Sequence, residues 1–255
     1  MVRPDLKEEL WLKRFISNEE MECLCEAMIK DFFKSKHYTN SLCVDIEAFV
    51  TEYLKLPIVY DSFAESDPGR IGYLSDGIRG LWVRRNGKAE QIVYPAKTVV
   101  LDRFLLNPSE SARKRFTIAH EGAHEMLNRH VPIQNQPAAA FHSEYDGSLD
   151  YTNDMNMLKD IMTLNEYCAN RAAACFLMPR FLVYRVLKHF KVSRPLILYE
   201  GGIPSQDVKL TIQRLADAMG VSYTAFFNRL RELKLFEIRP VEEYIHQNLQ
   251  YGGVV

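Results

Sequence analysis

Apolar residues near the start of the chain recur at three- and four-residue steps, as they do along one face of a helix. This spacing predicts helices over residues 5–16 and 18–36, with a capping box formed by Ser17 and Glu20 between them. The same spacing predicts another helix over residues 45–54. The chain therefore begins with helices that each present one apolar face to a core.

From residue 57 the pattern changes to short apolar runs separated by turn residues. These runs predict strands at 57–60, 71–74, 81–84, 91–94 and 98–102. The turn signals between them are Asp67-Pro68-Gly69, Ser75-Asp76-Gly77 and Asn86-Gly87. We therefore expect a small, mostly antiparallel sheet.

Helical spacing returns in the last part of the chain. It predicts helices over 164–179 and 181–190, and then a helix–turn–helix pattern in which Gly220 ends one helix and Ser222 caps the next. Helices followed by strands and then helices indicate an α+β fold. We divide the chain into an N-terminal helical extension (1–40), a central domain (41–180) and a C-terminal helical, helix–turn–helix-like region (181–255).

A metal-binding pattern follows the strands. A capping box is expected where Asn107 caps a helix, Pro108 takes its first position and Glu110 reaches back. His120 and His124 then lie four residues apart on one helix face, roughly 6 Å along the axis, which suits joint coordination of one divalent ion. The carboxylate of Glu121 lies between them and can act on water at that ion. The alternative is two surface histidines on a polar helix face.

A catalytic zinc site needs three protein ligands and one open position. The predicted helix over 164–179 carries Glu166 and Asn170 four residues apart on one face. Glu166 can ligate the ion, and Asn170 can accept the free N–H of a ligating histidine. The alternative is that Glu166 is a solvated first-turn glutamate, which is favourable beside the positive end of the helix dipole.

The stretch 129–156 offers other candidates for the third ligand: His130, His142, Glu144 and Asp146. A ligand on a long loop is positioned less well than one on a helix, so we favour Glu166. A segment of this length without clear periodicity is typical of a lid or binding loop. His142, Tyr145 and Tyr151 are the candidates there for a hydrogen bond to an oxyanion.

Two segments together resemble the signature of the ImmA/IrrE family of HExxH zinc metallo-endopeptidases. They are RFTIAHEGAH at 115–124 and EYCANRAAACFLMP at 166–179. The resemblance implies that His120, His124 and Glu166 are gluzincin-like metal ligands, that Glu121 is the general base, and that 41–180 is a metallopeptidase domain. It also implies cleavage of a helix–turn–helix repressor, with derepression of mobile-element or stress genes.

Two further expectations concern the surroundings of the metal helix. Glycine costs about 1 kcal/mol against alanine inside a helix, so Gly122 indicates a close approach by another element. Strand 98–102 directly precedes the metal helix, so we expect it beside the cleft, where its backbone would pair with an extended substrate.

Composition sets the background for these motifs. The chain has 255 residues, 47% of them hydrophobic and 25% charged, as is typical of a globular protein. No membrane span or secretory signal is evident, and the net charge of −1 disfavours nucleic acid as a partner. The odd number of cysteines indicates buried thiols in a reducing cytoplasm; they are Cys23, Cys25, Cys43, Cys168 and Cys175.

The leading expectation is a cytoplasmic, metal-dependent endopeptidase that uses Zn²⁺, with Mn²⁺ as the alternative ion. A second hypothesis is a DNA-binding or protein-interaction regulator with a structural metal site. In that case Arg229, Arg231 and Lys234 would form the basic face of the second helix of the helix–turn–helix pattern. A third is a toxin component with the same chemistry and a different target.

Overall fold

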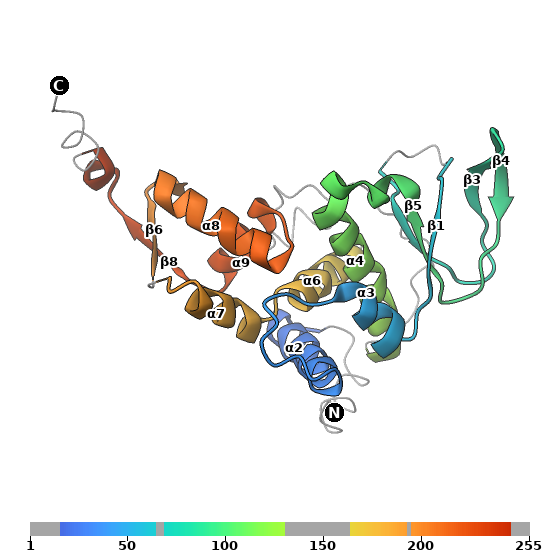
Figure 1. Cartoon of the computed structure of the whole chain (residues 1–255), viewed down its shortest axis with the longest axis horizontal. Helices are drawn as coiled ribbons and strands as arrows, with labels where there is room; N and C mark the ends of the chain where they lie inside the picture. The colour runs from blue at the N-terminus through green and yellow to red at the C-terminus, as the bar shows by residue number, and fades with distance from the viewer. Residues whose placement is uncertain (1–15, 65–68, 131–163, 193–194, 246–255) are drawn as a thin grey trace.

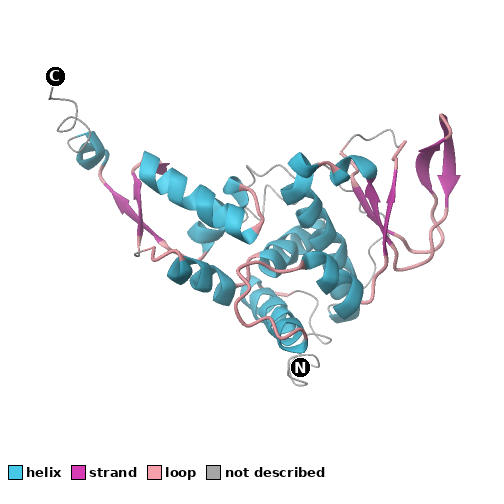
Figure 2. Ribbon diagram, in the orientation of Figure 1, coloured by secondary structure: helices cyan, strands magenta, loops and turns pink. Residues whose placement is uncertain are grey.

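The computed structural model describes residues 16–64, 69–130, 164–192 and 195–245. The fold is α+β, as predicted, with helices at the centre and small sheets at both ends of the long axis (Figures 1 and 2). The predicted helix over 5–16 lies outside the described residues. The divisions at residues 40 and 180 stay predictions.

Three helices form the centre of the molecule. Helix α6 (Leu164–Leu177) packs against α4 (Ser111–His130) on one side and against α2 (Asn18–Ser35) on another (Figure 1). Fully buried residues from all three, such as Leu24, Ala123 and Ala172, belong to one continuous core. None of the helices in the described ranges combines the length and apolarity that a bilayer crossing requires.

The predicted capping box at Ser17 is confirmed. The Ser17 hydroxyl accepts a hydrogen bond from the backbone N–H of Glu20, and the Glu20 carboxylate accepts one from the backbone N–H of Ser17 at 2.9 Å. The box predicted at Asn107 is wrong, because the Asn107 side chain makes no capping hydrogen bond. The chain enters α4 instead through two 3₁₀ turns, Arg103–Leu106 and Pro108–Glu110.

The helix predicted over 45–54 forms, but most of it is a π-helix, which is wider than an α-helix. A short α-helical turn, α3 (Ile46–Ala48), continues as a π-helix, η1 (Phe49–Tyr53). This segment lies against α4 at Gly122, where an added Cβ would be 2.9 Å from Cγ2 of Val50 and 3.1 Å from Cδ1 of Leu54. The close approach expected at Gly122 is therefore confirmed.

The strands between η1 and α4 form two small sheets rather than the one that we predicted, and most of their ladders are antiparallel, as expected. In the first, β5 (Val99–Asp102) is central, with β1 (Ile58–Asp61) parallel on one side and β2 (Gly72–Leu74) antiparallel on the other. Because β5 is paired along both edges, it cannot pair with a substrate. Among the described strands, β2 is the outer strand of this sheet on the side that contacts α4.

The second sheet is a hairpin of β3 (Leu81–Arg85) and β4 (Lys88–Ile92). The strand predicted over 91–94 is therefore wrong in register. Asn86 and Gly87 form a two-residue turn with φ values of 52° and 78°, and this turn pairs Arg85 directly with Lys88. The tight turn starts β4 three residues earlier than the apolar pattern indicated.

The C-terminal part contains the predicted helix α7 (Arg180–His189) and the helical pair α8 (Gln206–Met219) and α9 (Tyr223–Glu232). Gly220 ends α8 with a φ of 65°, and the Ser222 hydroxyl caps α9. A three-stranded sheet that we did not predict accompanies these helices. Its strands lie in the order β7 (Ile203–Pro204), β6 (Leu196–Tyr199) and β8 (Phe236–Arg239).

Gly122→Val tests the contact between η1 and α4. The added side chain meets Val50 and Leu54, so we expect the free energy of unfolding to fall by about 2 kcal/mol in urea denaturation. Adding Val50→Ala should restore more than half of this loss in a double-mutant cycle. Strictly additive effects of the two substitutions would show that the residues do not touch.

Candidate metal centre

Two imidazoles from α4 meet at its buried face. His120 and His124 are 6% and 8% exposed, and their Nε2 atoms lie 3.0 Å apart. The rings are nearly perpendicular, at 83°. The helical repeat places them one turn apart, and both Nε2 atoms point to a common location.

Glu166 reaches the same location from the first turn of α6. Its Oε2 lies 3.3 Å from Nε2 of His120, and its Oε1 lies 3.3 Å from Nε2 of His124. Donors about 2.05 Å from a tetrahedral zinc ion would be about 3.3 Å apart. The three residues therefore form a buried group that could hold a metal ion, with donor spacings suited to tetrahedral coordination.

Glu121 is fully buried and lies beside the edge strand β2. A Cβ added at Gly72 of β2 would be 2.6 Å from Oε1 of Glu121 and 2.5 Å from Cγ2 of Thr117. Only glycine allows the strand to come this close to α4. The arrangement places the Glu121 carboxylate against strand β2.

The other site residues that we predicted from the sequence are not all placed by the structure. Asn170 is buried one turn after Glu166, and its hydrogen bond to a ligating histidine stays a prediction. Among the residues that the structure describes, the metal-binding group does not include His130, which ends α4. His142, Glu144, Tyr145, Asp146 and Tyr151 lie outside the described residues.

The cysteine prediction is correct in part. Cys25, Cys168 and Cys175 are buried, whereas Cys23 is exposed and Cys43 is half-buried. Burial raises the pKa of Cys168 to about 11, so this thiol is protonated at neutral pH. It lies two residues from Glu166 but is not part of the metal-binding group.

Polar contacts that the sequence analysis missed hold both ends of α4. Near its C-terminal end, Glu125 accepts hydrogen bonds from Lys97 at 2.8 Å and Arg129 at 2.5 Å, and Arg129 also donates to the carbonyl of Leu54. The four-residue spacing of Glu125 and Arg129 was a usable sequence signal for that pair. Near the N-terminal end, Arg115 donates to the carbonyl of Gly220 at 2.8 Å, and so joins α4 to the end of α8.

A buried charge network holds α6. Arg229 of α9 pairs with Glu22 of α2 at 2.5 Å and with Glu232 at 2.9 Å, while Arg171 of α6 pairs with Glu232 and lies 3.6 Å from Glu22. Arg229 is only 1% exposed. Arg229 therefore cannot contribute to the basic face that the alternative DNA-binding hypothesis would require, and Lys234 lies beyond the end of α9.

Charge pairing within this network affects the titration of Glu22. Burial alone would raise the pKa of Glu22, but the hydrogen bond and charge of Arg229 outweigh it and lower the pKa below its usual value. Because the folded pKa lies below the unfolded one, ionised Glu22 stabilises the fold above the unfolded pKa. This contribution is lost as the pH falls through the folded pKa.

No protein-family model matches the chain, and no curated protein matches it either. The resemblance stated above therefore depends on the residues of the two signature segments alone.

Glu22→Gln tests the charge network. We expect the free energy of unfolding at pH 7 to fall by about 3 kcal/mol, because Arg229 loses a buried partner. The variant should also lose less stability than the wild type between about pH 5 and pH 3, measured by chemical denaturation. Glu26→Gln, in a pair with the exposed Lys30 on the same helix, is the matched control because the pair is open to solvent on the Lys30 side, and it should change stability by less than about 0.5 kcal/mol. Equal effects of the two substitutions would contradict a buried network.

Proposed function

We propose that the protein is a metal-dependent peptide hydrolase, most simply a zinc endopeptidase. The observation that carries the proposal is the buried group of His120, His124 and Glu166, in which the two Nε2 atoms lie 3.0 Å apart and each lies 3.3 Å from one carboxylate oxygen of Glu166. Glu121, next to His120 in the sequence, is fully buried. Three protein ligands leave one position for water or substrate, which distinguishes catalytic zinc sites from closed structural ones. A zinc ion bound there would polarise the scissile carbonyl and lower the pKa of water toward neutrality.

The chain's own residues then have distinct roles. His120 and His124 bind as neutral imidazoles through Nε2, and Glu166 supplies one negative charge. Glu121 accepts the proton of the attacking water and delivers it to the leaving amine nitrogen. Its burial keeps the carboxylate in place and excludes competing solvent.

The substrate strand would pair with β2 rather than β5. An extended peptide can add to an exposed strand edge through main-chain hydrogen bonds, and β2 provides the edge next to α4. Gly72 brings this edge within contact distance of Glu121. A peptide bond in a chain added there would lie near Glu121, the proposed base.

The substrate class comes from the resemblance to ImmA/IrrE metallo-endopeptidases. We propose a protein substrate, a helix–turn–helix repressor, whose cleavage in the cytoplasm derepresses mobile-element or stress genes. Incubating the purified enzyme with such a repressor and mapping new termini by mass spectrometry tests this part. Cleavage of unstructured peptides without cleavage of any repressor would support the proposed hydrolase activity and contradict the proposed repressor substrate.

The competing hypotheses differ in what they require of α9 and of the target. A DNA-binding regulator would need exposed cations on α9, and the burial of Arg229 removes one of them. A toxin component would share the metal chemistry. Growth arrest on expression, abolished by His120→Ala, would favour the toxin.

Glu121→Gln separates metal binding from chemistry. We expect about one zinc ion per chain in both wild type and variant by elemental analysis, because Glu121 is not a ligand. Hydrolysis of a quenched-fluorescence peptide library should fall by about 10²- to 10⁴-fold, because the base is lost. A variant that cleaves at the wild-type rate would show that Glu121 is not the base.

Glu166→Ala is the companion variant for the metal ligands. It should retain the fold by circular dichroism but bind zinc at least about tenfold more weakly, because one of three ligands is gone. Elemental analysis of the wild type also distinguishes zinc from manganese. Unchanged zinc affinity in Glu166→Ala would show that Glu166 is not a metal ligand and would contradict the proposal.

Gly72→Ala tests the contact between β2 and the base. The new Cβ would collide with Thr117 and Glu121, so one of these side chains or the strand must move. We expect hydrolysis to fall by at least about tenfold with metal content unchanged, since a shift on the order of 1 Å at a catalytic group is costly. Wild-type activity would show that β2 does not constrain Glu121.

A further inference from the structure

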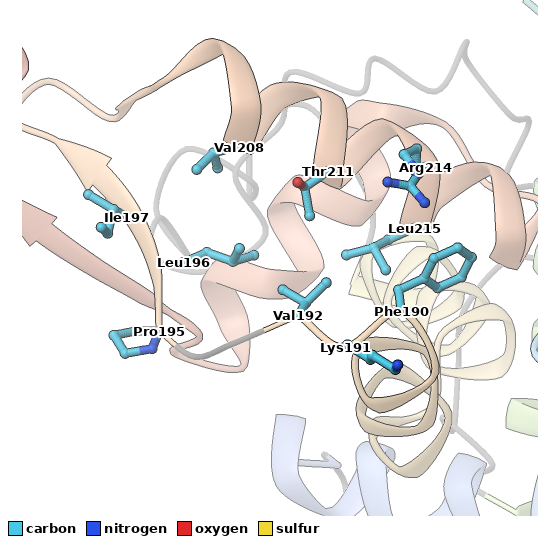
Figure 3. Close-up of a pocket in the computed structure, with 10 residues that line it drawn as sticks. All are labelled: Phe190, Lys191, Val192, Pro195, Leu196, Ile197, Val208, Thr211, Arg214 and Leu215. Carbon is cyan, nitrogen blue, oxygen red and sulfur yellow. The ribbon is translucent and has the colours of Figure 1, made fainter.

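A cavity lies far along the sequence from the metal-binding residues, between the end of α7, strand β6 and helix α8 (Figure 3). Its volume is about 340 Å³, and none of its lining residues belongs to the metal-binding group. This volume is near the lower end of the range for small-molecule sites and suits a ligand on the order of ten non-hydrogen atoms.

The two ends of the cavity differ in chemistry. Figure 3 shows Arg214 and Lys191 beside Phe190 at one end, and Ile197 and Val208 at the other. The Arg214 guanidinium lies over the Phe190 ring, with Cζ 5.6 Å from the ring centroid. One end therefore offers positive charge and the other a hydrocarbon surface.

The charged end is not neutralised from within the described part of the chain. Among the described residues, no acidic side chain lines the cavity and none forms a salt bridge with Lys191 or Arg214. Lys191 adopts a φ of 53° just after α7, where the N–H of Val192 donates to the carbonyl of Leu187 and closes the helix end. The backbone that carries this cation is thus fixed before any ligand arrives.

We propose that this cavity binds a small amphipathic carboxylate. The carboxylate would accept hydrogen bonds from Arg214, with Lys191 adding positive charge at the same end of the cavity, and its hydrocarbon tail would extend toward Ile197 and Val208. A neutral ligand leaves the two cations without a counter-charge, and a purely ionic one leaves the apolar walls in contact with water. The geometry favours a ligand that has both parts.

Octanoate, with about ten non-hydrogen atoms, is the first probe, and hexanoate and 4-phenylbutyrate complete the set. Calorimetric titration should show saturable binding at one site for at least one of the three. Octanamide, which has the same tail without the charge, should bind at least about tenfold more weakly. Amide shifts in nuclear magnetic resonance spectra should map the site to α8 and β6.

Arg214→Gln should weaken binding of the carboxylate about tenfold and leave the fold intact, because the side chain is exposed. Lys209→Gln is the matched control, since it removes the same charge from the same helix outside the cavity, and it should bind like the wild type. Failure of all three carboxylates to bind at about 10 mM, or equal binding by the amide or by Arg214→Gln, would overturn the proposal. Glu166→Ala should bind octanoate normally, so the result does not depend on the proposed hydrolase.

Discussion

The close approach of α6 to α4 is the constraint on which the metal-binding group depends. Neither helix alone carries three donors, because α4 supplies two imidazoles and α6 supplies the carboxylate. Distances between packed helices depend on the side chains at their contact, and small residues give the shortest distances. Both helices contribute fully buried alanines to the core: Ala119 and Ala123 from α4, and Ala169, Ala172 and Ala173 from α6.

The same packing buries groups that are expensive to remove from water. His120, His124, Glu121 and Glu166 are each less than 10% exposed. Buried carboxylates are tolerated when they are paired or bind a cation. A divalent ion among these groups would offset the desolvation of two carboxylates, so metal binding and folding stability are expected to be linked. A helix pair that only needed to pack would be more stable with apolar residues at these positions.

Sequence patterns predicted the local parts of the structure well. The helix ends at Ser17, Gly220 and Ser222 follow from hydrogen bonds within a few residues, and the close contact at Gly122 follows from the cost of glycine in a helix. The spacing of His120 and His124 likewise fixes their common face. Glu166 was harder to choose, since its partners lie on another helix and a first-turn glutamate has a simpler explanation.

Contacts between distant parts of the chain were not predictable in the same way. The parallel pairing of β1 with β5 depends on the path of residues 62–98 between them, and short strands carry no signal for their neighbours. The partner of Arg229 is Glu22, which lies 207 positions away. An arginine on a helix with a glutamate three residues later reads as a solvated surface pair, and only the folded structure shows that both are buried.

The helix–turn–helix pattern is a case in which local sequence patterns and contacts between distant residues give different information. Its caps and apolar spacing specify two helices and the turn between them, and they are the same whether the second helix faces DNA or the protein core. Here Arg229 forms a buried ion pair with Glu22 of α2, and Arg115 of α4 donates a hydrogen bond to the carbonyl of Gly220 at the end of α8. The first contact leads to α2, which packs against α6, and the second leads to α4. Arg171 of α6 also pairs with Glu232 of α9, so the C-terminal helices contact both helices that carry the metal-binding group. Substitutions in this region are therefore expected to act on the metal-binding group through its supporting helices.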